Sequence, residues 1–311
     1  MNRSTRPAVD PRVVSAFGVS REGQPLSYNR APAPDLAPWI ARLSVTKLDI
    51  PADYAFSCSL FADAAGVRFQ ISGALEANTR DGLQGFAPGA LFCGPHTRSM
   101  PVRVAGGFTS IGISFRPSAC TALLGPRVPE YVDRIAPIKD SSAQLLLSSI
   151  DQSASAEQWL KALETVLRRV LDLRGPQPEP VTARFEEIAF RNPSMSIAQA
   201  ARDIGVDRRR LERLVLRDFG LPPKQVLRRA RALDMASYLR GVADDAEAAA
   251  LSLRYYDESH LIHEFTELFG MSPRQFMALP QPLLTLNLEI RQARRLEMIG
   301  RIAPGAKRPW E

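Results

Sequence analysis

The clearest hydrophobic pattern in the chain lies in residues 207–220, DRRRLERLVLRDFG. Leu211, Leu214 and Val215 recur there at positions i, i+3 and i+4, the spacing of a helix that buries one side. The first residue of the stretch, an aspartate, is suited to cap the helix, and the last, a glycine, can end it in a left-handed conformation. The pattern therefore predicts a capped amphipathic helix.

A shorter helix is predicted just upstream, in residues 196–205, SIAQAARDIG. Ser196 and Gln199 have the spacing of a capping box, and Gly205 permits a sharp turn before the next helix. On the longer helix, Arg209 and Arg213 are four residues apart and are therefore neighbours on a face away from the apolar stripe. This arrangement suggests a helix-turn-helix that presents a recognition helix to DNA.

A solvated basic helix in an ordinary helical domain would carry the same charges, but this unit occurs twice. FGLPPKQV at 219–226 is followed fifty positions later by FGMSPRQF at 269–276, and at the same offset Leu211 matches Leu261 and Arg213 matches His263. Upstream of the turn the offset falls to 49, so the second copy has one extra residue in its turn. A repeat at a nearly constant spacing indicates architecture rather than chance composition.

The amino-terminal half has a different texture, with short apolar or alternating segments broken by Gly and Pro. Candidate strands are residues 40–48, 54–62, 67–73, 90–93, 99–104 and 109–115. These predict a small antiparallel barrel or sandwich. Helices are expected at 118–124, 142–150 and 156–173, and a long helix at 224–240 joins the two repeated units.

These elements divide the chain into five parts and give an α+β fold class. Residues 1–37 are expected to be mobile, and 38–174 to form a β-rich regulatory domain with trailing helices. The proline-rich stretch 175–181 is a linker, 182–279 form an all-α domain with two helix-turn-helix subdomains, and 280–311 form a basic, partly helical tail.

The charge is concentrated in the helical domain. The chain has 311 residues and a formal net charge of +7, and residues 208–231 alone contain nine Lys and Arg against Glu212 and Asp218, a local +7. A single basic strip indicates an anionic partner on one face, and DNA fits that face better than a membrane. The first ten residues lack the apolar core of a secretory signal, and no apolar run has the length of a membrane span, so we expect a cytoplasmic protein.

The repeated unit resembles the signature of AraC/XylS-type transcription regulators. The resemblance rests on LRYYDESHLIHEFTELFG at 253–270 with the following MSPRQF, and it extends over about 182–279. It implies two helix-turn-helix subdomains joined by a rigid helix, with the recognition helices in successive major grooves on one face of the duplex. It also implies a bacterial protein that is associated with the nucleoid. Residues 92–124 also resemble an uncharacterised amino-terminal domain found on some of these regulators.

The resemblance assigns roles residue by residue. In the first unit the base-reading positions correspond to Arg209 and Arg213, with Arg210 and Glu212 beside them, and in the second to Glu258, Ser259 and His263. An Arg fork suits guanine because it meets O6 and N7 together. Candidates for contacts with the DNA backbone are Arg208, Lys224, Arg228, Arg229, His260 and Arg274. Arg217 is expected to be solvated or ion-paired within the domain.

Two departures from the family pattern fall in the second unit. The family usually has Gly at its turn, where this chain has Arg254, and a left-handed residue other than Gly costs about 1–2 kcal/mol. The second departure is the helix expected before that turn, at 245–253, which has few large apolar side chains. In addition, His263 occupies a position where Arg is common. We therefore expect the second unit to be less stable or to read DNA more weakly than the first.

The amino-terminal domain offers little catalytic chemistry. His96 is the only histidine before the helical domain, and a metal cupin needs two or three, so we expect no metal, no cofactor and no enzyme. Cys58, Cys93 and Cys120 are interpreted as core thiols rather than sensors, and Arg116 as the partner of a carboxylate rather than of an anionic effector.

The sequence therefore predicts a sequence-specific regulator controlled by its amino-terminal domain, with double-stranded DNA as partner. Further candidate partners are a small-molecule effector, RNA polymerase and a second copy of the chain. Two other functions stay open, an architectural DNA-binding protein of low sequence specificity and an enzyme domain fused to a DNA-binding module.

Overall fold

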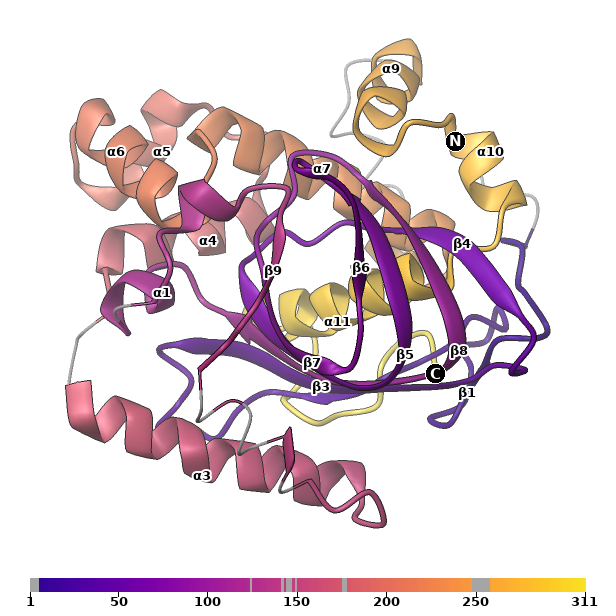
Figure 1. Ribbon diagram of the computed structural model, residues 1–311. Coiled ribbons are helices and arrows are strands. Elements are labelled where there is room, and N and C mark those ends of the chain that lie inside the picture. The colour runs from indigo at the N-terminus through magenta and orange to yellow at the C-terminus, as the bar shows by residue number, and fades with distance from the viewer. Residues whose placement is uncertain are drawn as a thin grey trace.

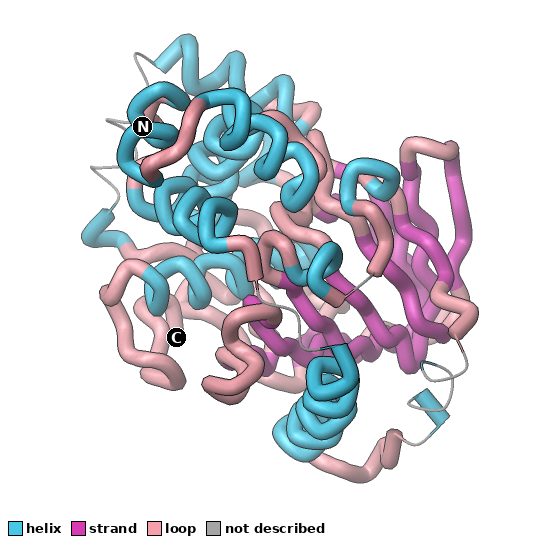
Figure 2. The backbone as a smooth tube through the Cα atoms, turned by 90° about the vertical axis from the view of Figure 1, so that its left-hand side faces the viewer, coloured by secondary structure: helices cyan, strands magenta, loops and turns pink. Residues whose placement is uncertain are grey.

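A curved antiparallel sheet forms the amino-terminal half of the protein; most of the helices gather beside it, one long helix lies below it in the view of Figure 1, and another lies inside its curve (Figures 1 and 2). The computed structural model describes residues 6–123, 125–140, 143, 147–148, 150–174, 178–247 and 258–311. The strands are β1 (Val14–Ser15), β2 (Tyr28–Arg30), β3 (Ile40–Asp49), β4 (Ala55–Leu60), β5 (Gly66–Thr79), β6 (Gly82–Phe86), β7 (Gly89–Cys93), β8 (Met100–Phe115) and β9 (Ile135–Pro137). Their order along the sheet is β1-β3-β8-β5-β7-β9, with β2 paired to β3, β4 to β8 and β6 to β5.

Two long strands replace the shorter segments that the sequence predicts. The expected strands 99–104 and 109–115 are one strand, β8, because the Gly106-Gly107 pair bends the strand and does not end it. Gly106 has a φ of 70°, and on either side of the bend β8 pairs first with β4 and then with β3. The expected strand 67–73 likewise continues to Thr79 and returns through Arg80 and Asp81 into β6, a strand that we did not predict.

Strand β3 is buried on both of its faces. Successive side chains point to opposite faces of a strand. Leu43 and Val45 therefore share one face of β3, and Thr46 and Leu48 share the other. The first pair belongs to the apolar cluster formed with Trp159 of α3 (Ala156–Arg174). Leu48 belongs to a separate cluster inside the curve of the sheet. A strand covered on both sides in this way is part of the protein core.

Helices α4 to α11 form the carboxy-terminal half. They are α4 (Pro180–Arg191), α5 (Ile197–Ile204), α6 (Arg208–Phe219), α7 (Pro223–Leu239), α9 (Glu258–Phe269), α10 (Pro273–Ala278) and α11 (Pro282–Met298). Short helices α1 (Ala119–Ala122), η1 (Val128–Tyr131) and η2 (Asp245–Glu247) lie in connections. The expected α+β fold, a β-rich half followed by a helical half, is confirmed. The helix expected at 142–150 falls mostly outside the described residues.

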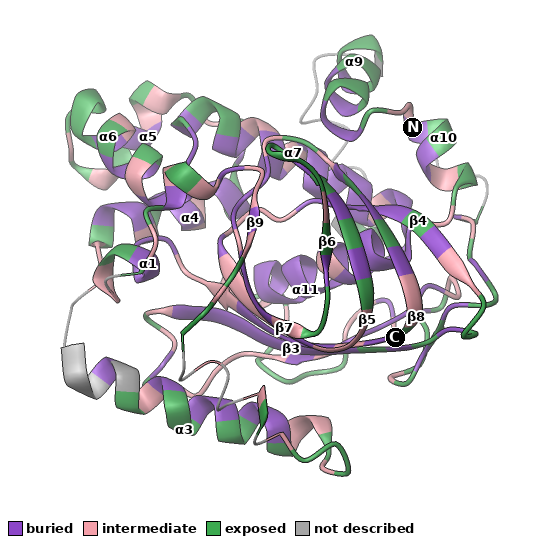
Figure 3. Ribbon diagram, viewed as in Figure 1, coloured by how far each residue is buried: buried purple, intermediate pink, exposed green. Residues whose placement is uncertain are grey.

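The carboxy-terminal tail forms the buried helix α11, which lies inside the curve of the sheet (Figures 1 and 3). Leu283 and Leu286 pack with the strands in the inner cluster of the sheet, whereas Leu284 and Leu288 pack with α7, α9 and α10. The basic character of the tail misled the sequence interpretation, because the arginines of α11 are buried and ion-paired. The helix therefore joins the two halves of the protein.

Residues 6–37, which we expected to be mobile, are packed against the rest of the chain. Gln24 is fully buried, and its side chain accepts a hydrogen bond from the Arg240 guanidinium at the end of α7. The Ala8 amide donates to the Met277 carbonyl of α10 at 2.7 Å. Leu26 belongs to the same apolar cluster as α9. The segment therefore packs against the second helix-turn-helix unit.

Candidate DNA-binding surface

The first helix-turn-helix has the termini that its sequence predicts. The Ser196 side chain caps α5 by accepting a hydrogen bond from the Gln199 amide at 3.2 Å, and Gly205 ends that helix with a φ of 80°. Asp207 then caps α6 by accepting from the Arg210 amide at 2.8 Å. Gly220 ends α6 with a φ of 73°. Because both ends of α6 are held by these caps, its register relative to α5 is well defined.

Helix α6 has one buried and one exposed face (Figure 3). Leu211 and Val215 are fully buried in a cluster with Phe185 of α4 and Leu227 of α7, as the spacing predicts. The exposed face carries cationic and polar side chains, namely Arg208, Arg209, Arg210, Glu212 and Arg213, of which Glu212 is half-buried. The helix is therefore anchored by its apolar side and presents its arginines to solvent.

Two arginines of α6, unlike Arg209 and Arg213, form ion pairs within the protein. Arg208 Nε donates to a Glu212 carboxylate oxygen at 2.7 Å, one helical turn away. Arg217, near the end of α6, pairs at 2.6 Å with the buried Asp218, so it is ion-paired within the domain, as expected. Within the ranges that the structure describes, Arg209 and Arg213 form no ion pair. Their guanidinium groups are therefore available to a ligand.

The second unit presents a less basic helix. In α9, Leu261, Phe265 and Leu268 are buried, whereas Ser259 and His263 are exposed. His260 is also exposed. The side chain of Glu258 and the turn with Arg254 lie outside the described residues, as does most of the helix expected before that turn. Ser272 and Gln275 form a complete capping box at the start of α10, and the neighbouring Arg274 is exposed.

Helix α7 fixes the orientation of α9 through a cluster of ion pairs. The carboxylate of Glu264, which is 4% exposed, accepts hydrogen bonds from Arg228 Nε at 3.1 Å and from Arg231 Nη2 at 2.9 Å. Arg228 also pairs with Glu267, and its hydrogen bond lowers the pKa of that carboxyl. Arg228 thus has an internal role in the junction between the units, in addition to any contact with a phosphate.

Arg229 does not lie on the surface, contrary to the expectation of a backbone contact. Its guanidinium donates to the carbonyl oxygens of Asp63 at 2.6 Å and His96 at 2.7 Å, and the residue is 2% exposed. Burial lowers its pKa to about 10. Arg229 therefore holds α7 against the loops of the β domain, whereas Lys224, five residues earlier, is exposed.

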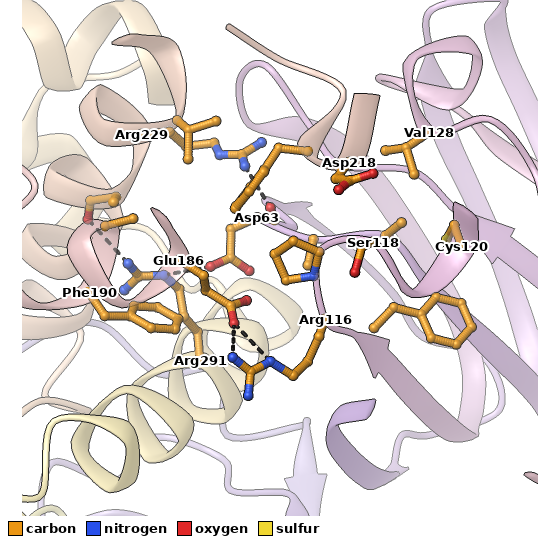
Figure 4. A pocket seen from close by; sticks show the side chains of 18 of the residues that line it. Asp63, Arg116, Ser118, Cys120, Val128, Glu186, Phe190, Asp218, Arg229 and Arg291 are labelled. Carbon is orange, nitrogen blue, oxygen red and sulfur yellow. Dashed lines mark hydrogen bonds and ion pairs between the residues drawn. The ribbon is translucent and has the colours of Figure 1, made fainter. Parts of the chain in front are cut away.

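A network of charges closes the junction between the two halves (Figure 4). Glu186 of α4 accepts a hydrogen bond from Arg116 Nε at 3.1 Å and also pairs with Arg294 of α11. Arg291 of α11 pairs with Asp63 at 2.9 Å. Arg116 therefore has a carboxylate partner, as expected, although that partner belongs to the other half of the protein. The cavity among these residues has a volume of about 30 Å³, room for one or two waters.

The remaining candidate groups of the β domain are neutral, and all of them are buried except Cys93, which is half-buried. Burial raises the pKa of Cys58 and of Cys120 to about 12 and also raises that of Cys93, so these thiols stay protonated at neutral pH. His96 is buried, and desolvation lowers its pKa to about 4. Its Nδ1 accepts from the Ala62 amide at 3.3 Å. Such groups are typical of a packed core.

Comparison with known proteins supports the assignment of both halves. Residues 200–278 match the family model of a helix-turn-helix domain, and residues 28–137 match that of a domain of unknown function (DUF6597). A search of curated proteins gives no match. None of the helices in the described ranges is both long enough and apolar enough to cross a membrane.

Two solved structures are among those similar to the chain. ToxT from Vibrio cholerae, in a crystal structure with an unsaturated fatty acid bound, is 10% identical, with 76% of this chain and 94% of that chain covered and a TM-score of 0.43. The AraC-like transcriptional activator CuxR is 17% identical, with 62% and 76% covered and a TM-score of 0.30. Because both TM-scores are low, neither structure defines the role of a side chain in this protein.

The paired helix-turn-helix units and the family match define the class of this protein, a DNA-binding transcription regulator. More particularly, the chain has an AraC-type helix-turn-helix domain at its carboxy terminus and a DUF6597 domain before it.

Proposed function

We propose that the protein binds DNA sequence-specifically, with α6 and α9 in successive major-groove segments about one helical turn, roughly 34–36 Å, apart. The observation that carries this proposal is the pair Arg209 and Arg213. Both are exposed on the face of α6 opposite the buried stripe, and neither has an ion-pair partner within the described ranges. A guanidinium without an internal partner can donate both of its parallel N–H groups to guanine O6 and N7.

We propose that the first unit supplies most of the specificity. The exposed face of α9 offers Ser259 and His263, where α6 offers arginines, and Glu267 on the same helix is held by Arg228. Fewer charged donors give weaker discrimination between bases. The exposed Lys224 and Arg274 each stand in the first turn of the helix that follows a recognition helix, and they are suited to phosphates.

We propose that the β domain controls DNA binding by setting the positions of the two units. Both units contact it directly: Gly220 lies against Val132, and the Phe269 ring packs on Phe61 with centroids 5.2 Å apart. The cavity inside the charge network has room for only one or two waters, so we expect an effector to act by changing the contact between the halves rather than by filling that cavity.

The test is selection of DNA fragments by the purified full-length protein at physiological salt, followed by titration of the selected duplex. We expect a motif with two blocks about one turn apart. Arg213→Ala should weaken binding by about 1–3 kcal/mol and relax the preference at one base pair. Arg103→Ala, which removes an exposed cation from β8 that is paired with Glu76, is the matched control and should leave binding unchanged.

Other results would point to other functions. Equal affinity for random and selected duplexes, with no effect of Arg213→Ala on base preference, would indicate an architectural DNA-binding protein. A motif with a single block would show that α9 contacts only the backbone. Lys224→Ala should weaken all sequences alike and lower the salt dependence by about one ion, which separates a phosphate contact from a base contact.

A further inference from the structure

A wide groove separates α6 from a loop of the β domain. Its volume is about 1080 Å³. One wall is formed by residues of the segment 125–129, which leads into η1, and the other by α6 and the start of α7. We call it the η1 groove. It is continuous with the exposed face of α6, because Arg213 and Leu216 line it and Leu216 is 44% exposed.

The η1 groove is strongly cationic. Its lining includes Arg127, Arg208, Arg213, Arg217 and Lys224 against one carboxylate, Glu212. That carboxylate is already paired with Arg208, and Arg217 is paired with Asp218. Arg127, the cation contributed by the β domain, pairs with Glu130 at 2.9 Å, but the two side chains are 83% and 55% exposed. An exposed pair of this kind is weak and can be exchanged for a stronger anion.

The position of Arg127 is set by its neighbours. Pro126 precedes it, and Val128, which follows it, is buried and begins η1, with Pro129 as the second residue of that helix. A proline fixes its own φ and restricts the residue before it, so the backbone is restricted at Pro126 and at Val128, the two neighbours of Arg127. Val128 and Val132 lie against Gly220 at the end of α6. The loop therefore holds Arg127 at a defined place beside the recognition helix, on a rigid base.

We propose that the η1 groove accepts one strand of the DNA backbone and that Arg127 contacts a phosphate there, so that the β domain is itself part of the DNA-binding surface. This inference rests on the proposed function, in which α6 enters a major groove. A helix in the major groove lies between two phosphate backbones, and cations flanking the helix meet those phosphates. The groove has the position and the charge for one of them.

The contact is sequence-independent and is measured by salt dependence. With the full chain and its selected duplex, we expect Arg127→Ala to reduce the slope of log K against log salt by about 0.9, without changing base preference. Between 50 and 200 mM salt the variant should therefore lose about 3.5-fold less affinity than the unchanged protein does. Arg127→Lys should retain the slope.

Controls separate this inference from the proposed function. Arg103→Ala, which removes a comparably exposed ion pair from β8, should retain the original slope. If Arg127→Ala kept the salt slope of the unchanged protein while Arg213→Ala still relaxed the base preference, the role of the groove would be overturned and the proposed function would stand. If Arg213→Ala changed neither the base preference nor the affinity, the proposed function would be overturned instead. Unchanged thermal midpoints would show that all variants are folded.

Discussion

Alanine substitutions at Gly220 and Gly270 test how tightly the first helix-turn-helix unit packs against the β domain. The two glycines end α6 and α9 at equivalent positions of the repeat, with φ values of 73° and 71°. An alanine at either position must adopt a left-handed conformation, which costs about 1–2 kcal/mol. Their surroundings differ. A Cβ at Gly270 would have no atom within 4 Å, whereas one at Gly220 would lie 2.8 Å from Val132 Cγ2 and 3.2 Å from Val128 Cγ1.

The two substitutions should therefore differ in stability by the cost of overpacking alone. Inserting a methyl group into a packed contact costs about 1–3 kcal/mol. Gly220→Ala should then destabilise the protein by about 2–5 kcal/mol and Gly270→Ala by about 1–2 kcal/mol. At about 2.1 cal/mol/K per residue, the unfolding entropy of this 311-residue chain is about 0.65 kcal/mol/K, so the Gly220 variant should melt about 1.5–5 °C below the Gly270 variant.

The assay is thermal denaturation of both variants, followed by circular dichroism at one scan rate and one protein concentration. A double-mutant cycle with Val132→Ala tests the cause, because removal of the Val132 methyl groups should relieve part of the cost of Gly220→Ala. Equal melting temperatures for the two single variants would refute the tight contact between α6 and the β domain. Additive effects in the cycle would assign the loss to a different neighbour.

Three further perturbations test the junction and its core. Glu186→Gln removes the charge of a buried carboxylate that pairs with two arginines, and it should destabilise the protein by about 3–5 kcal/mol in the same denaturation assay. The control is Glu187→Gln, at a surface carboxylate paired with Arg184, which should cost at most about 1 kcal/mol. Burial lowers the pKa of His96 from 6.5 to about 4, so between these pH values the unfolded chain binds more protons than the folded chain. The stability of the protein should therefore fall as the pH drops from 6.5 toward 4. A His96→Asn variant should show a flatter profile of melting temperature over that range. Leu286→Ala removes a side chain of α11 that is 2% exposed and should cost about 2–5 kcal/mol; a smaller loss than for exposed Leu279→Ala would contradict the packing of α11 in the sheet.

Local signals in the sequence predict the helix-turn-helix well because the information is local. The caps at Ser196 and Asp207 and the glycines at 205 and 220 lie within one or two helical turns of the residues they organise. The apolar stripe of α6 follows from the helical period alone. The Asp81-Gly82 pair that turns β5 into β6 carried the same kind of local signal, which our strand prediction missed.

Contacts between distant parts of the chain were not predictable in this way. Arg228 and Arg229 are adjacent on one helix, and only the packing partner shows that the second faces the β domain while the first faces α9. The charge of the tail gave no sign that Arg291 would pair with Asp63 and Asp234. A buried arginine needs a partner that is far away in sequence, and a single sequence does not show which residue that is.

The position of α11 determines what control by the β domain requires. Leu283 and Leu286 of this helix pack into the sheet, and Leu284 and Leu288 pack into the second helix-turn-helix unit. Exposing one such side chain costs about 1.5–3 kcal/mol, so complete separation of the two halves would expose several of them at once and would unfold the protein first. On the proposed function, a ligand can shift the protein only by its difference in affinity between two states, typically a few kcal/mol. Control must therefore work through a small displacement within the junction rather than through separation of the two halves.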